Sequence, residues 1–303
     1  MRSKLSFLSL VLVTGVMLAF APVARGAAAG AQPQGQIKAV RVRGEVFATI
    51  KATQVRSTLA DNTFITDGTT VTTGKGASVV LVFSNGATIN LGTDSALDID
   101  RFTQDAFTTG FNAATITEEP TTSTTRLHLA HGELVSKVAK LHQSNGSSFI
   151  VDTPVGAAGI RGTTFRIVFI PDGAGHATFT LTTLEGNVAV TLATGTVNAP
   201  AVSVTNGQEV SVAATVTTDA AGNVTVTLPS GASTAVPTTA SAATTQQVTD
   251  SAAVIAQAVA NVVIAPPPPP AGGGTQNNTN SNTNETPTPA IQPINPTVVS
   301  PSA

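Results

Sequence analysis

The sequence predicts an all-β protein, an irregular β-roll or solenoid-like stack of short hairpins, with one C-terminal helix and a disordered tail. Ala, Thr, Val and Gly dominate its 303 residues, and the β-branched Thr and Val favour a pleated surface. Short alternating apolar runs recur between residues 36 and 228, separated by glycine-containing turns. These turn glycines are Gly44, Gly86, Gly132, Gly186 and Gly207. Because a regular solenoid would repeat evenly, we expect an irregular stack.

The N-terminus has the features of an export signal. Arg2 and Lys4 precede an uncharged stretch that is apolar at its centre, and Pro22 is followed by small residues. This order predicts a signal peptide over residues 1–29, cleaved after Gly26 or after Ala29. A signal peptide in turn predicts an extracytoplasmic protein, located in the periplasm, on the cell surface or secreted. The alternative is an uncleaved membrane anchor, because about 20 residues can just span a bilayer.

Charge and cysteine content narrow the possible partners. Without Arg2, Lys4 and Arg25, 12 basic residues remain against 17 acidic ones, a balance of −5. No cluster of Lys or Arg remains, so we expect neither nucleic acid nor an anionic membrane as a partner, and no stable membrane span once the signal is cleaved. The absence of cysteine excludes disulfides, thiolate metal sites and a Cys nucleophile.

We predict that the β-domain spans residues 36–228. The sequence Asn85-Gly86 between two apolar runs is the strongest hairpin signal. Similar runs surround four further predicted turns, at residues 131–132, 185–186, 206–207 and 220–223.

One stretch inside this domain, residues 101–125, contains few strong strand formers and is predicted to be an inserted loop. Its three phenylalanines, Phe102, Phe107 and Phe111, are expected to hold it against the core.

The C-terminal quarter changes character. Residues 229–248 are predicted to be a linker and residues 249–265 a short amphipathic helix, capped by Thr249 or Asp250. The apolar face of this helix is expected to dock on the edge of the β-domain or, alternatively, to pair with a partner. Residues 266–303, rich in Pro, Gly, Asn and Thr, are predicted to be a polyproline II spacer followed by a disordered tail.

The most informative segment lies between residues 149 and 168. We predict that one strand enters, that Pro154 ends it, that three glycines form a tight loop, and that a second strand leaves. Glycines at this spacing resemble a phosphate cradle. However, no Lys-Ser/Thr follows them, and a strand rather than a helix comes next, so nucleotide binding is not expected.

The same segment resembles the signature of the FecR domain family. The matching residues are Pro154, Gly156, Gly159, Arg161, Gly162, Thr163 and Phe165. Other segments match in the same order: residues 59–76, the hairpin around Gly86, and the later turns at Gly132, Gly186 and Gly207. The resemblance covers about residues 40–215.

The resemblance implies an extracytoplasmic β-rich domain, some of whose relatives relay a ligand signal from an outer-membrane receptor to a sigma factor. Those regulators carry a cytoplasmic helical segment before one transmembrane span, whereas only four residues precede the apolar stretch here. We therefore expect a stand-alone exported module that binds or signals through an envelope protein partner. The alternative is a structural surface protein tethered by its Pro/Asn/Thr-rich tail.

Arg161 is the one charged residue of the signature, and two roles remain open for it. Its guanidinium contacts a partner, or it anchors the loop internally by bonding carbonyl groups. Because Trp and Tyr are absent, binding would depend on strand edges or small polar turns.

Three groups of titratable residues were considered as catalytic or metal sites. His128 and His131 are predicted to lie on a strand, where residues three apart point to opposite faces. The pair at residues 118–119 is predicted to be a solvated loop. Asp98 and Asp100 share one face of a strand, but calcium usually needs more oxygen ligands. We therefore predict a non-enzyme with no catalytic, cofactor or metal site.

Overall fold

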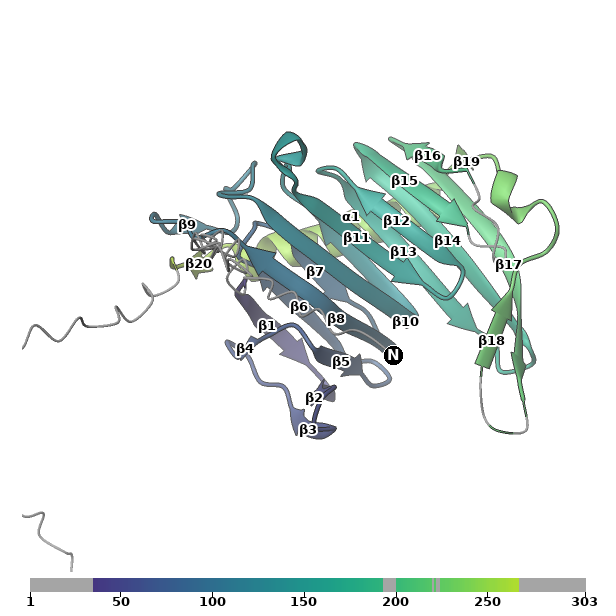
Figure 1. The fold of residues 1–303 in the computed structure, drawn as a ribbon, viewed down its shortest axis with the longest axis horizontal. Helices are drawn as coiled ribbons and strands as arrows, with labels where there is room; N and C mark the ends of the chain where they lie inside the picture. The colour runs from purple at the N-terminus through teal and green to yellow at the C-terminus, as the bar shows by residue number, and fades with distance from the viewer. Residues whose placement is uncertain (1–34, 193–199, 220, 222–223, 267–303) are drawn as a thin grey trace, which may run out of the picture. The chain divides into compact units, whose positions relative to one another are not determined.

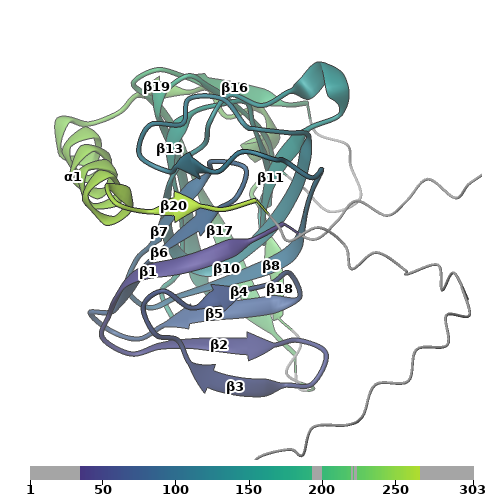
Figure 2. The same cartoon turned by 90° about the vertical axis from the view of Figure 1, so that its left-hand side faces the viewer.

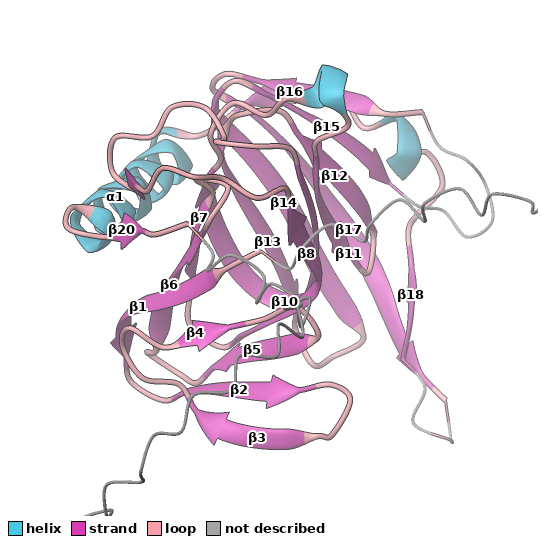
Figure 3. Ribbon diagram, turned by 60° about the vertical axis from the view of Figure 1, so that its left-hand side comes forward, coloured by secondary structure: helices cyan, strands magenta, loops and turns pink. Residues whose placement is uncertain are grey.

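The structure is a computed structural model that describes residues 35–192, 200–219, 221 and 224–266. Within these residues the chain forms twenty β-strands, two short 3-10 helices and one α-helix, so the predicted β class is confirmed. Strands and their connections dominate the view in Figure 3. The predicted signal peptide and the tail beyond Pro266 lie outside the described residues.

Most strands belong to two open sheets that share the long strand β10. Sheet A has the order β3 (Val55–Thr58), β2 (Val46–Ile50), β5 (Thr69–Thr73), β8 (Ser95–Gln104), β10 (Ser123–Lys137), β11 (Ser148–Thr153), β12 (Gly156–Ile160), β15 (Asn187–Leu192) and β16 (Val202–Thr205). The neighbours β10 and β11 are parallel, and the other neighbours in this sheet are antiparallel.

Sheet B is antiparallel. Its order is β4 (Phe64–Ile65), β1 (Ile37–Arg43), β6 (Ser78–Phe83), β7 (Thr88–Leu91), the second half of β10, β13 (Thr164–Pro171), β14 (His176–Glu185) and β17 (Gln208–Thr218). Both β18 (Val224–Thr227) and β19 (Thr238–Thr239) pair with β17. The remaining elements are the pair β9 (Phe111–Asn112) and β20 (Val263–Ile264), and the 3-10 helices η1 (Gln143–Asn145) and η2 (Ala232–Thr234).

Several predicted hairpin turns are in fact corners, positions where the chain passes from one sheet to the other. The β6–β7 pairing confirms the hairpin at Asn85-Gly86. Strands β17 and β18 pair on either side of the turn predicted at residues 220–223, but most of that turn lies outside the described residues. At Gly186 and Gly207, however, the flanking strands belong to different sheets. At Gly132 no turn occurs, because β10 continues through it from sheet A into sheet B.

The main core lies between the two sheets, and a second core lies on the outer face of sheet B. The two faces of strand β6 contribute side chains to different cores. Its residues Val79, Leu81 and Phe83 belong to the core between the sheets, whereas Val80 and Val82 belong to the outer core. This alternation follows from the two-residue period of a strand, and burial on both faces explains the continuous apolar run.

The predicted inserted loop is shorter than expected. Strand β8 continues to Gln104, and β10 begins at Ser123. Phe102 is fully buried between the sheets and packs edge-on against Phe83, with ring centroids 5.1 Å apart. Phe107 instead belongs to the outer core, where Phe111 packs against it. The phenylalanines therefore attach this segment to two different cores.

A single α-helix, α1 (Ala242–Val259), covers the outer core and begins earlier than the predicted helix at residues 249–265. Ser241 caps it by accepting a hydrogen bond from the Thr244 N–H, 3.0 Å away. The helix therefore occupies much of the predicted linker, and the predicted last turn forms β20 instead. The Thr-rich first turns contain few apolar residues, so the periodic pattern signals only the second half of the helix.

The length of α1 matches the surface that it covers. Its 18 residues span about 27 Å. It contacts six neighbouring strands of sheet B, namely β1, β6, β7, β10, β13 and β14. At a spacing of about 4.8 Å these strands span about 24 Å. Figure 2 shows the helix lying outside the strands of this sheet. None of the helices in the described part of the chain is long and apolar enough to cross a membrane.

Candidate functional site

The signature residues surround β12 and the corner that follows it. Pro154 and Val155 form the turn between β11 and β12. Residues 156–160 are not the predicted glycine loop but a strand in the interior of sheet A, with β11 on one side and β15 on the other. The chain then turns at residues 161–163, here called the signature corner, and enters β13 in sheet B.

Two of the signature glycines are required by close backbone contacts. A Cβ on Gly156, whose φ is +149°, would lie 2.1 Å from the Thr191 carbonyl oxygen. A Cβ on Gly162, whose φ is +82°, would lie 3.0 Å from the Lys140 Cα. Gly159 has a looser environment, because its nearest neighbour would be the Ala189 carbonyl oxygen at 3.7 Å. The glycines at positions 156 and 162 thus allow backbone segments to approach each other closely.

Thr163 and Phe165 are buried, and both have structural roles. The Thr163 carbonyl accepts a hydrogen bond from the Val138 N–H at 2.9 Å, which fastens the corner to the end of β10. The Thr163 hydroxyl has no hydrogen-bond partner among the described residues. The Phe165 ring is fully buried in the core between the sheets.

Arg161 differs from the other signature residues, because its side chain is exposed. No hydrogen bond or ion pair joins it to any residue that the structure describes, so the loop carbonyls proposed as its internal partners do not bind it.

The surface around the corner is formed by neighbouring turns. Gly186 lies against Thr163, since a Cβ there would meet the Thr163 Cγ2 at 2.5 Å. The Gly186 N–H donates to the Asn206 side-chain oxygen at 2.5 Å. Glu185, Asn187 and Lys140 are exposed. The corner is therefore surrounded by small and polar residues, as expected for a protein without Trp and Tyr.

A buried carboxylate supports the segment beneath the corner, which corrects the prediction that residues 118–119 are solvated. Glu119 is only 2% exposed. It accepts hydrogen bonds from the Ser123 hydroxyl and from the His142 N–H, each at 2.6 Å. Glu118 remains on the surface, 3.2 Å from the His142 Nε2 and 3.7 Å from the Lys140 Nζ. Because a buried carboxylate must be hydrogen-bonded, Glu119 holds residues 119–123 and 138–142 together.

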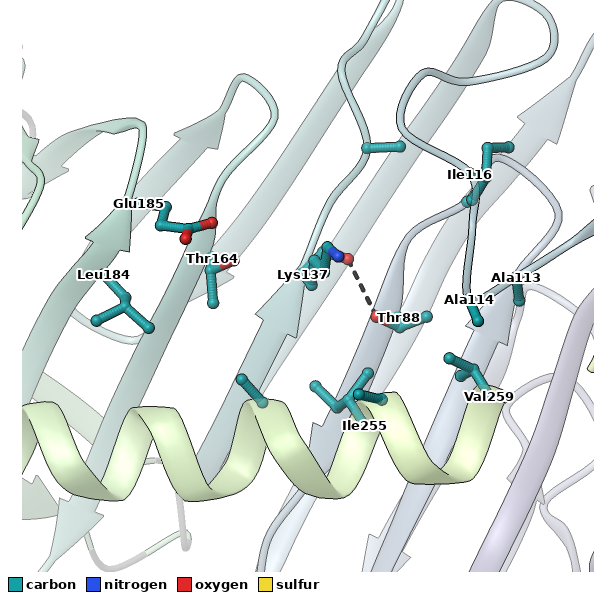
Figure 4. A pocket seen from close by; sticks show the side chains of 14 residues that line it. Thr88, Ala113, Ala114, Ile116, Lys137, Thr164, Leu184, Glu185, Ile255 and Val259 are labelled. Carbon is teal, nitrogen blue, oxygen red and sulfur yellow. Dashed lines mark hydrogen bonds between the residues drawn. The ribbon is translucent and has the colours of Figure 1, made fainter. Parts of the chain in front are cut away.

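A cavity of about 240 Å³ lies between α1 and sheet B, next to the signature corner (Figure 4). Ile255 and Val259 point from the helix toward the strands, and the Thr88 hydroxyl donates to the Lys137 carbonyl at 3.2 Å. The wall is mostly apolar, with a few polar groups where Thr164 and Glu185 approach the corner. The helix therefore packs incompletely on the face that it covers.

The two histidines considered for metal binding lie on β10, as the sequence predicts. The expectation that they point apart is wrong, because the register of β10 shifts between Leu129 and His131. As a result, His128 and His131 line one hollow, of about 520 Å³, at the opposite end of β12 from the signature corner. No cluster of three or more His, Cys, Asp or Glu side chains in the described parts of the chain is arranged to hold a metal ion.

The two aspartates of β8 share one face, as predicted, and an ammonium group lies between them. The Lys51 Nζ is 2.8 Å from Asp100 and 3.4 Å from Asp98. The hydrogen bond to Asp100, together with the charge of Asp98, raises the pKa of Lys51 above its ordinary value of 10.5. The ammonium group of Lys51 thus lies between Asp98 and Asp100, the two carboxylates that the sequence offers as calcium ligands.

The chain is similar to one protein family over part of its length and, more distantly, to solved structures. Two crystal structures of a "putative anti-sigma factor" from Parabacteroides distasonis ATCC 8503, at 2.50 Å and 1.65 Å resolution, each show 12% identity and a TM-score of 0.34 over 52% of this chain. This chain covers 59% of that protein, less than two thirds of its length. No curated protein matches the chain. Residues 69–198 match the family model described as FecR protein. The resemblance is therefore confirmed, and this segment of the chain is a FecR domain.

Proposed function

We propose that the chain is an exported, non-catalytic module of the cell envelope that binds or signals through a protein partner at the signature corner. One observation carries the proposal. The signature has two large side chains. Phe165 is buried in the core, whereas Arg161 is exposed and its side chain makes no hydrogen bond or ion pair with any described residue. A free arginine offers five hydrogen-bond donors in a planar fork, which suits a carboxylate or backbone carbonyls of another protein.

The surroundings of Arg161 support recognition of a protein rather than catalysis. The corner is held rigidly from below, by the Thr163 carbonyl and by the Glu119 network at residues 138–142. A rigid support lowers the entropy lost when a partner binds. The exposed neighbours Glu185 and Asn187 add polar groups of the kind found around the rim of protein interfaces.

Photo-crosslinking in the full-length chain tests the proposal. A photoreactive residue at Arg161 is expected to capture a specific envelope protein in envelope extracts. The matched control is the same residue at Arg101, an exposed arginine on β8 away from the corner. Equal capture from both positions, or capture from neither, would contradict a binding role for the corner.

Substitution of the arginine provides the quantitative test. We expect Arg161→Ala to weaken binding of the captured protein by about tenfold or more, because an interface arginine commonly contributes more than ~1.4 kcal/mol. The unfolding midpoint is expected to stay unchanged, since the side chain is exposed and makes no internal bond. Arg101→Ala serves as the control for both measurements. A loss of stability in Arg161→Ala without a loss of binding would support the internal-anchor role instead.

A further inference from the structure

We propose that the edge of β18 that has no partner strand among the described residues pairs with β18 of a second copy of the chain to form a two-fold symmetric dimer. This inference is independent of the proposed function, because it concerns the end of the molecule opposite Arg161. The five residues of β12 separate the Pro154 turn from the signature corner by about 17 Å. Figure 1 shows β18 beside β17 at one side of the sheets.

The edge strands of the two sheets are not equally open to pairing. Edge β3 carries Arg56, whose guanidinium lies over the Phe47 ring at 3.8 Å, and charge on an edge opposes pairing. Edge β4 is only two residues long. On β16 the Thr205 N–H already donates to the Gln208 side chain at 3.0 Å. By contrast, β18 is four residues long and reads Val-Thr-Val-Thr, with no charge to discourage a second strand.

At the edge formed by β18, apolar side chains of the core between the sheets remain partly exposed beside a hollow. Val216 and Val226 face each other across the β17–β18 pair and pack, only partly buried, against the core between the sheets. Both line the 520 Å³ hollow, together with Phe169 and Pro171 from β13. Val224 lines it as well and is 63% exposed. Among the described residues, the hollow is lined by two histidines, His128 and His131, and by no Asp, Glu, Lys or Arg, so most of its wall suits uncharged, apolar side chains.

The strand that best meets these requirements is β18 itself. In an antiparallel pair of β18 strands, the two-residue period places the valines of both copies on the hollow side and the threonines on the other side. The pairing satisfies the free backbone groups of both edges and buries Val224, and the two paired strands carry no charged side chain. Because the same patch is used twice, the contact closes as a dimer instead of propagating as a fibre.

Disulfide trapping provides a direct test, because the chain contains no cysteine. Thr225→Cys and Thr227→Cys, made separately in the full-length chain, place a thiol on the solvent side of β18. On mild oxidation we expect at least one of them to give a disulfide-linked dimer. Ser57→Cys on the edge strand β3 is the matched control and is expected to stay monomeric. If neither β18 variant crosslinks faster than the control, the dimer model is wrong.

Sedimentation of the unmodified chain over a range of concentrations gives the second test. We expect a monomer–dimer equilibrium that Thr225→Lys weakens by about tenfold, since a charged side chain on an edge strand opposes pairing with a second strand. The circular dichroism spectrum and unfolding midpoint of Thr225→Lys should match those of the parent chain, because Thr225 is exposed. Arg161→Ala should leave the dimer intact. A chain that is monomeric throughout, or a dimer unaffected by Thr225→Lys, would overturn the proposal.

Discussion

Single residues in the FecR signature have different physical roles, although the signature spans only twelve positions, residues 154–165. Gly156 and Gly162 allow backbone segments to approach, and Phe165 fills the core between the sheets. Only Arg161 presents a charged group to solvent without an internal partner among the described residues. The signature therefore combines a structural framework with one exposed residue, and it is this combination that makes the corner a candidate binding site.

The difference between two glycines of the same strand can be measured. Gly156→Ala should destabilise the protein by about 2–4 kcal/mol, because its Cβ would clash with the Thr191 carbonyl at a φ that L-residues rarely adopt. Gly159→Ala should be neutral or stabilise by up to ~1 kcal/mol, since its φ is ordinary and its Cβ has room. Chemical denaturation of both variants provides the comparison. Equal destabilisation of the two would mean that the tight approach at Gly156 does not matter.

Among the elements, the local sequence predicted whether a segment is a strand or a helix better than it predicted which strands lie side by side. The β6–β7 hairpin was predictable, because Asn85-Gly86 joins strands that pair directly. The turns predicted at Gly132 and Gly186 carry a similar local signal, yet at Gly132 strand β10 continues without a turn from sheet A into sheet B, whereas at Gly186 one strand ends and the next begins in the other sheet. A glycine permits a sharp change of direction, but which strand lies beside the outgoing segment depends on distant residues.

The incomplete packing of α1 leads to a prediction for the helix as an element. Ala252→Leu should stabilise the protein by about 0.5–2 kcal/mol, because Ala252 lines the cavity between the helix and sheet B. Ala253→Leu is the matched control, since Ala253 is exposed on the same helix and the change in helix propensity is the same. It should shift stability by less than about 0.5 kcal/mol. Thermal unfolding of both variants checks the difference. A destabilised Ala252→Leu would show that the cavity cannot accept a larger side chain.

At the scale of the whole molecule, the tail offers a test of the alternative function. Deleting residues 266–303 should leave the unfolding free energy unchanged, because their composition provides nothing to build a core. If the chain is a binding module, the truncated protein should also remain in the envelope fraction and keep its crosslink from Arg161. Loss of the truncated protein from that fraction, with its fold intact, would support the tethered surface protein instead.

The β class, several strands of the FecR segment and the family match of that segment could be predicted from the sequence alone, whereas β12 was predicted as a loop. These features depend on local properties, namely two-residue alternation, β-branched composition and turn residues. Each of these properties can be recognised in a stretch of a few residues. The single helix was also predictable, although its first turns were not, because Thr-rich turns lack an apolar period.

Four features could be recognised only in the folded protein: which turns are corners, the burial of Glu119, the exposure of Arg161, and the edge of β18 that has no partner strand among the described residues. Each of these depends on contacts between residues far apart in the chain. Glu118 and Glu119 are neighbours of the same type, and only the approach of Ser123 and residues 138–142 separates a surface carboxylate from a buried one. The strand pattern is thus set locally, whereas burial and the free surfaces follow from how the strands are paired.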